Sequence, residues 1–93
     1  MARAGSATVA DATETKIFDD ANGCSKFIVA CLTASAVSAL VRVPGLHGAG
    51  EYVTVEADQN VVFELGKLGI KEVFAAGNGG NATITYGVVG INL

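Results

Sequence analysis

His47 is the first residue to consider for chemistry because it is the one histidine of the chain. A histidine works as a general base when a nucleophile and an orienting carboxylate stand beside it. The serines lack the glycine-flanked context of a nucleophile elbow; they are Ser6, Ser25, Ser35 and Ser38. We therefore expect no catalytic residue, and we interpret His47 as a solvated histidine in a loop.

Cys24 and Cys31 could form a disulfide or bind a metal ion, but their spacing argues against both. If the segment between them is extended at about 3.3 Å per residue, their Cα atoms lie on the order of 23 Å apart, beyond the reach of a disulfide. We expect two reduced thiols, with Cys31 in the core. A zinc site would need a Cys-x-x-Cys pair and more ligands than His47 supplies, so we expect no metal.

Two acidic segments and a glycine-rich segment complete the candidates. Neither Asp19-Asp20 nor Glu56-Ala57-Asp58 has the spacing of a calcium loop, and such residues are typical of turns. The segment 45–50, Gly-Leu-His-Gly-Ala-Gly, lacks the Gly-Lys-Ser/Thr ending of a phosphate loop and precedes a predicted strand. We interpret it as a long connection, and we expect no cofactor.

Composition limits the class of protein. The chain has 93 residues, of which 51% are hydrophobic and 16% charged, so it is one folded domain with a thin core. Its net charge of −3 argues against a nucleic-acid partner. The longest uncharged stretch, residues 27–41, is too short to span a bilayer, and the first twenty residues lack the apolar run of a signal peptide. We expect neither membrane association nor export.

Alternation of apolar and polar residues predicts the first strands. Residues 15–18 form a short strand that a turn at 19–23 closes, and residues 26–33, apolar on both parities, form a central strand covered on both faces. Residues 37–43 place Val37, Ala39, Val41 and Val43 on one face. A helix over residues 31–42 is the alternative, because the apolar spacing there also fits a helical period.

The second half predicts two hairpins. Residues 51–57 and 61–65 flank a turn at 58–60, and residues 70–76 and 82–89 flank the Gly77–Asn81 turn. Residues 1–14 fit neither period and are interpreted as a flexible N-terminal arm. The fold class is therefore all-β, with residues 15–93 forming a small antiparallel β-sandwich or jelly-roll-like barrel of six to seven short strands.

Two segments carry a resemblance to a known family. They are Leu-Gly-Ile-Lys-Glu-Val-Phe-Ala at 68–75 and Gly-Gly-Asn-Ala-Thr-Ile-Thr-Tyr-Gly-Val-Val at 79–89. With their surroundings, residues 41–92, they resemble small β-rich proteins encoded among the head genes of tailed bacteriophages. Such proteins are typically capsid decoration or cement proteins, which gather, often as trimers, on the outside of the major capsid lattice.

The resemblance implies a non-enzymatic structural protein of the virion, made in the host cytoplasm. Its partner would be the major capsid protein, which it would bind as a homotrimer. Apolar surplus on so small a domain is typical of an interface. The candidate contact residues lie in the arm, which could add a strand to a sheet edge, and around the glycine-rich segment: Ala4, Ser6, Val9, Leu46, His47 and Tyr52. The alternative is a phage tail or receptor-binding module that recognises glycans through residues 45–50, although aromatic platforms are scarce.

Overall fold

The computed structural model describes residues 4–32, 37–48, 50–65 and 69–89. These residues contain strands and no helix, so the helical alternative for residues 31–42 is wrong wherever that segment is described. The described part of the chain forms eight strands, against the six to seven expected: β1 (Ala4–Val9), β2 (Thr15–Cys24), β3 (Lys26–Cys31), β4 (Ser38–Arg42), β5 (Val53–Val55), β6 (Gln59–Glu64), β7 (Ile70–Asn78) and β8 (Ala82–Val89).

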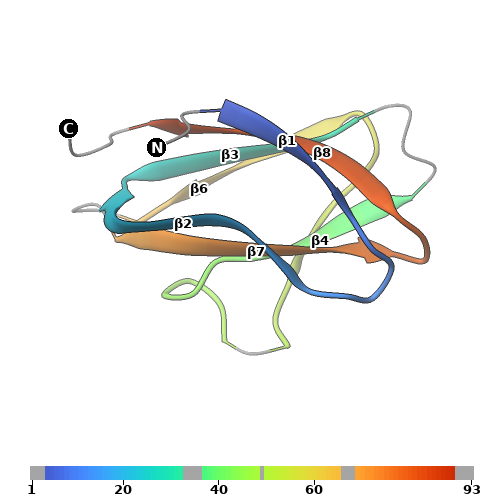
Figure 1. Cartoon of the computed structure of the whole chain (residues 1–93), viewed down its shortest axis with the longest axis horizontal. Helices are drawn as coiled ribbons and strands as arrows, with labels where there is room; N and C mark the ends of the chain where they lie inside the picture. Colours follow the sequence, from blue (N-terminus) through green and yellow to red (C-terminus); the bar gives the residue numbers. More distant parts are fainter. Residues whose placement is uncertain (1–3, 33–36, 49, 66–68, 90–93) are drawn as a thin grey trace.

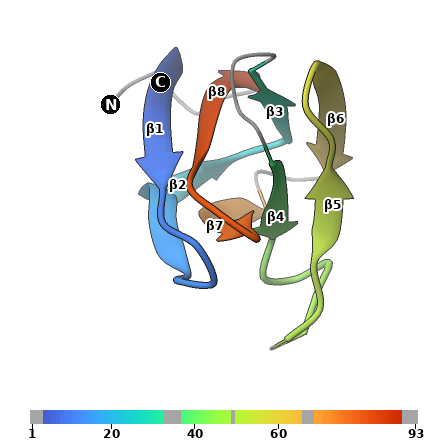
Figure 2. The same cartoon turned by 90° about the vertical axis from the view of Figure 1, so that its right-hand side faces the viewer.

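The strands form two four-stranded antiparallel sheets that pack face to face (Figures 1 and 2). Sheet A has the order β1-β8-β3-β6, and sheet B has the order β2-β7-β4-β5. Consecutive strands lie in opposite sheets, except for β4 and β5, which are neighbours in sheet B. This order is that of an eight-stranded jelly roll, so the predicted all-β sandwich or jelly-roll class is confirmed.

The core lies between the sheets and is built from the inward residues of each strand. On β3, Phe27, Val29 and Cys31 are buried, whereas Ile28 and Ala30 point outward and are half-buried. The central position predicted for β3 is confirmed, but its outer face is not fully covered. On β4 and just beyond, the predicted inward set is buried at Ala39, Val41 and Val43 and half-buried at Val37.

Both predicted hairpins are wrong, because the chain changes sheet at each of their turns. Strand β5 pairs with β4 and strand β6 pairs with β3. Likewise β7 lies in sheet B and β8 in sheet A. Turn residues and alternation predict where a chain reverses, but they carry no information on whether the next strand pairs with the last or crosses the core. In this protein both strands of each pair bury their apolar faces by facing each other across the sandwich.

The arm predicted for residues 1–14 is wrong for residues 4–9, which form β1; residues 1–3 lie outside the described part of the chain. Strand β1 pairs with β8 from Ala4↔Gly87 to Val9↔Ala82. Its inward residues are Gly5, Ala7 and Val9, and only Val9 is large enough to be read as part of a hydrophobic face. Because two of the three inward residues are so small, the sequence of β1 shows no clear alternation of hydrophobic and polar residues.

The chain then continues into a β2 that is longer than predicted. The turn expected at residues 19–23 lies inside this ten-residue strand. The pairing of β2 with β7 has two register shifts, one between Lys16 and Phe18 and one between Asp19 and Cys24. The polar residues read as a turn therefore mark bulges, which add residues to a strand without ending it. Small residues and glycines in the sequence also predict breaks at residues 33–36 and 66–69, of which residues 33–36 and 66–68 lie outside the described part of the chain.

Candidate functional site

The outer face of sheet A is nearly free of charge. We call it the uncharged face, and it comprises Ala4, Ser6, Thr8, Ile28, Ala30, Asn60, Val62, Thr83, Thr85 and Gly87. The same sheet positions carry two charged residues, Lys26 and Glu64, which lie at one end as a pair with 3.9 Å between Nζ and Oε1. Since the charged pair is terminal, the rest of the face presents small, hydroxyl and aliphatic side chains and the amide of Asn60.

The two sides of the uncharged face, one near β6 and the other near β1, differ in polarity. Near β6, Val62 is 51% exposed and lies opposite the half-buried Ile28. Near β1, the hydroxyl oxygens of Thr8 and Thr83 lie 3.4 Å apart. A surface of this composition can be covered without burying a charge, and depletion of charge is what distinguishes the centre of protein interfaces. The face is thus suited to contact with another protein.

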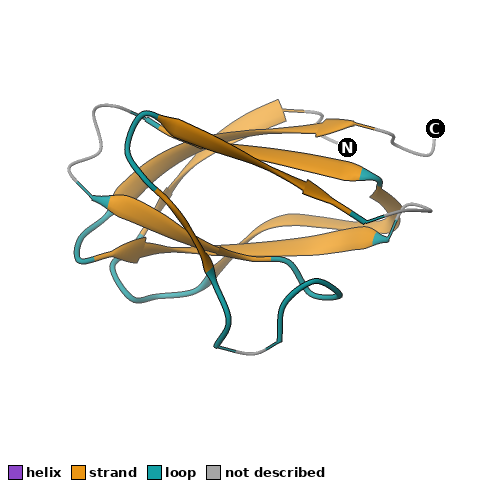
Figure 3. Ribbon diagram, turned by 180° about the vertical axis from the view of Figure 1, so that it is seen from behind, coloured by secondary structure: helices purple, strands orange, loops and turns teal. Residues whose placement is uncertain are grey.

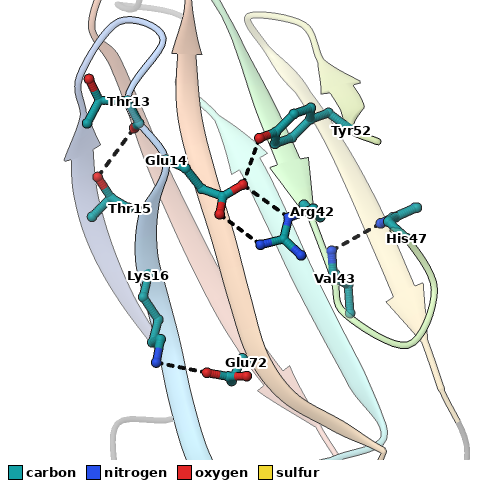
Figure 4. Close-up of polar contacts among 9 residues, drawn as sticks. All are labelled: Thr13, Glu14, Thr15, Lys16, Arg42, Val43, His47, Tyr52 and Glu72. Carbon is teal, nitrogen blue, oxygen red and sulfur yellow. Dashed lines mark hydrogen bonds and ion pairs between the residues drawn. The ribbon is translucent and has the colours of Figure 1, made fainter. Parts of the chain in front are cut away.

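The outer face of sheet B is charged, and its centre is an ion pair that joins Glu14 to Arg42 (Figure 4). Arg42 donates from Nε and Nη2 to the two carboxylate oxygens of Glu14, at 3.0 and 2.8 Å. The hydroxyl of Tyr52 donates to the same carboxylate at 2.7 Å. These bonds, that from Arg42 first, lower the pKa of Glu14 from 4.5 to about 2, and they raise the pKa of both Arg42 and Tyr52.

The same cluster continues along the sheet around Phe74. The Arg42 guanidinium lies 4.6 Å from the centre of the Phe74 ring, and the Lys16 ammonium lies 5.7 Å from it. Lys16 also pairs with Glu72 at 2.8 Å and with Asp19 at 3.5 Å, and the hydrogen bond that Lys16 donates to Glu72 is the main reason that the pKa of Lys16 is raised. The charges of this face are therefore bonded to one another, an arrangement that fastens β2, β4 and β7 together.

His47 stabilises its own loop. The connection between β4 and β5, to which it belongs, projects from the body of the protein (Figure 3). The Nδ1 atom of His47 accepts a hydrogen bond from the backbone N–H of Val43 at 3.0 Å, and its ring packs edge-on against Phe63 with 5.9 Å between ring centres. The expectation of a solvated histidine is wrong, since the side chain is half-buried and its Nδ1 is engaged with the backbone.

The described residues contain little that could hold a small ligand. A hollow of about 170 Å³ lies at one end of β3 and β6, lined by Ala30, Cys31, Leu32, Asp58, Gln59 and Asn60. Pockets for cofactors and drug-sized ligands are larger, roughly 300–1,000 Å³. Within the described ranges, no three residues among His, Cys, Asp and Glu gather as metal ligands. Both cysteines are buried and free, as predicted, and burial raises the pKa of Cys24.

The six predicted contact residues fall into separate places. Ala4 and Ser6 are exposed on the uncharged face, but Val9 is fully buried, so Val9 is wrong as a contact residue. Leu46 is 42% exposed and Tyr52 37% exposed, and both belong with His47 to the connection that leaves sheet B. The structure thus brings Ala4 and Ser6 together but separates them from the other three.

Several residues of the two outer faces were not among the predicted contact residues. On sheet A these are Thr8, Ile28, Val62 and Thr85, and strand alternation alone does place them outward. On sheet B the missed residues are Glu14, Arg42 and Phe74, which lie on three segments far apart in the chain. Their meeting depends on the strand order, which the sequence does not reveal.

Comparisons with known proteins identify the fold and no family. No family model matches the chain, and no curated protein matches it. Among solved structures, it is similar to the solution structure of a de novo designed double-stranded β-helix, with a TM-score of 0.61. That likeness covers 92% of this chain and 97% of the designed one at 10% sequence identity. The chain therefore has an eight-stranded jelly-roll fold. No helix long and apolar enough to cross a membrane is found among the described residues.

Proposed function

We propose that the chain is a non-enzymatic structural protein that binds the outside of a phage capsid and reinforces it, as a decoration or cement protein. Jelly rolls recur in viral capsid and lectin domains and in cupins. The fold is therefore compatible with this function but does not distinguish it from others. The observation that carries the proposal is the uncharged face, which extends over the four strands of sheet A on one side of a small domain. The partner is the major capsid protein of the shell.

The contrast between the two outer faces supports the choice of sheet A. Sheet B pairs its charges internally, as with Arg42 and Glu14, and burying them further would require a partner that compensates for their desolvation. Sheet A has no such cost in its middle, where Thr85 and Ile28 lie. By resemblance, the protein sits on the capsid surface of the virion as a symmetric oligomer, and a trimer is the stoichiometry that the resemblance predicts.

Co-sedimentation with shells tests the proposal. Purified protein is mixed with shells of the phage that encodes it, assembled without this protein, and the bound fraction is measured against concentration. Thr85→Lys places a charge in the middle of the uncharged face and should weaken binding at least about tenfold. The control is Thr54→Lys, the same change at an exposed position on β5 in sheet B, which should bind as the wild type does. Failure of the wild-type protein to bind, or equal binding by Thr85→Lys, would count against the proposal.

Glycan recognition through residues 45–50 is the alternative function. Its support is the exposure of Leu46 and Tyr52 beside the loop, since an exposed aromatic ring can stack on a sugar. Against it, the Tyr52 hydroxyl and the Glu14 carboxylate bond each other and not an open site. A glycan array that gives a signal with the wild type and none with Tyr52→Ala would favour this alternative.

A further inference from the structure

The four edge strands of the two sheets are unequal. Strands β1 and β6 form the edges of sheet A, and strands β2 and β5 form those of sheet B. An edge strand exposes backbone N–H and C=O groups that can pair with another strand, and proteins block this with charges, prolines, bulges or short strands. The presence or absence of these features therefore indicates which edges are protected from pairing and which are open to it.

Three of the edges carry such protection. Strand β2 contains Lys16, Asp19 and Asp20 and has two register shifts in its pairing with β7. Strand β5 is only three residues long. Strand β6 ends in a charged residue, Glu64, within the strand itself. These three edges are poor templates for an added strand.

Strand β1 carries none of these features within its described residues. Its sequence, Ala-Gly-Ser-Ala-Thr-Val, has no charge and no proline. Its pairing with β8 runs without a register shift from Ala4↔Gly87 to Val9↔Ala82. No described strand pairs with its other side, and Ala4, Ser6 and Thr8 are exposed. Strand β1 is therefore a regularly paired edge strand of sheet A whose outer side is uncharged.

We propose that this edge is a self-association site, at which β1 of one copy pairs antiparallel with β1 of a second copy across a two-fold axis. Such pairing would join the two A sheets into one continuous sheet. A two-fold axis places the edge residues nearest to it close to their own counterparts, so a charge near the centre of the strand would repel its copy. Strand β1 has no charge to repel, and its small side chains permit close approach.

The register follows from the alternation of side chains. Directly opposed residues in an antiparallel pair lie on the same face of the sheet, and a shift of one residue would turn the core face outward. Ser6 and Thr8 belong to the uncharged face, whereas Ala7 and Val9 face the core. The two-fold axis must therefore pass through a residue and not between two, and centring the pair on Ser6 or on Ala7 gives the longest overlap within β1. In either register, a charge at position 6 meets its counterpart at or beside the axis.

This contact is independent of shell binding and of the trimer that the resemblance predicts. A three-fold assembly requires two different surfaces to meet, whereas pairing of β1 with β1 uses one surface twice. The two contacts could coexist on one chain, and because Ser6 and Thr8 also belong to the uncharged face, it is the absence of shells from the measurement that separates them. Self-association is measured without any shell, so its failure leaves the proposed function standing.

The experiment is sedimentation equilibrium of the full chain from micromolar to millimolar concentration. The wild type should approach twice the 9.4 kDa of one chain, or an even multiple of that mass. Ser6→Lys, at an exposed position, should raise the dissociation constant at least about tenfold, and Thr8→Lys should do the same. Asn60→Lys, the same charge on the edge strand at the other side of sheet A, is the control and should associate as the wild type does.

Circular dichroism and thermal unfolding must first establish that each variant is folded. Thr8→Lys keeps the test valid if Ser6→Lys does not fold. A wild type that stays monomeric throughout would overturn the proposal. So would an oligomer, trimeric or otherwise, whose mass is unchanged by both β1 substitutions or is lowered equally by Asn60→Lys.

Discussion

Gly5 lies directly opposite Tyr86 in the pairing of β1 with β8, and a Cβ atom on Gly5 would come within 2.6 Å of the Tyr86 hydroxyl. Tyr86 in turn stacks on the fully buried Phe27, with 5.3 Å between ring centres. An aromatic ring that covers a cross-strand glycine pins the register of a sheet edge. This relationship explains how β1 holds its place although most of its residues are small.

We predict that Gly5→Ala destabilises the protein by about 1–2 kcal/mol, because the added methyl group must displace the Tyr86 ring. Urea unfolding of the two single variants and the double variant with Tyr86→Ala measures the coupling. The penalty of Gly5→Ala should largely disappear when Tyr86 is already alanine. Equal penalties in both backgrounds would mean that the two residues do not interact as described.

The pKa of Glu14 gives a second prediction. Because folding lowers this pKa from 4.5 to about 2, the charged carboxylate stabilises the folded state above pH 4.5, and that contribution is lost as the pH falls toward 2. Wild-type stability should fall across this window more steeply than that of Glu14→Gln. Unfolding curves measured through the same pH range for both proteins check this.

Carbon chemical shifts of the Glu14 carboxyl group follow its titration directly. Tyr52→Phe keeps the ring and removes the hydroxyl, so the midpoint should rise above that of the wild type. Arg42→Gln should raise it further, because the bond from Arg42 is the larger cause of the lowered pKa. If the midpoint were the same in all three proteins, the cluster would not exist in solution.

Part of this arrangement could be predicted from the sequence. Alternation placed Ala39 and Val41 inward, since it depends only on the period of two within one strand. The meeting of Glu14 with Arg42 could not be predicted, because it needs the order of strands across sheet B. The unknown strand order also explains why both predicted hairpins are wrong. The same turn residues occur whether the next strand pairs with the previous one or crosses to the other sheet.

Strand β1 was missed for a different reason. Its inward positions include Gly5 and Ala7, which do not register as hydrophobic, and their fit depends on Tyr86 and Ile84 of a strand about eighty residues later. Long-range partners thus decide whether a run of small residues becomes a strand or a loose terminus. The uncharged face was equally hidden, because it collects alternate residues from four strands.

The role of His47 is tested by His47→Asn and His47→Gln, whose side-chain amides differ in length. In His47→Asn the side-chain oxygen lies near the place of Nδ1 and can still accept from the Val43 N–H, whereas in His47→Gln it lies one bond further out. We expect His47→Gln to lose about 1–2 kcal/mol of stability, and His47→Asn to lose less. Hydrogen exchange at the Val43 amide should accelerate in His47→Gln. Equal exchange in both variants would exclude the bond seen to Nδ1.

The two thiols give a fourth prediction. Cys24 and Cys31 are buried and unpaired, and burial raises the pKa of Cys24, so a thiol reagent should react slowly with the native protein. After unfolding in denaturant without reductant, both thiols should react at once. Fewer than two reactive thiols in the unfolded protein would indicate a disulfide and contradict the structure.

Electron cryomicroscopy of purified particles of the phage that, on this proposal, encodes the chain tests the proposed function most directly. The account predicts density for an eight-stranded jelly roll on the outside of the shell, with the face that carries Thr85 and Ile28 against the major capsid protein. Mass spectrometry of the same particles should detect the chain. Particles that lack the protein, or that hold it with sheet B against the shell, would contradict the account.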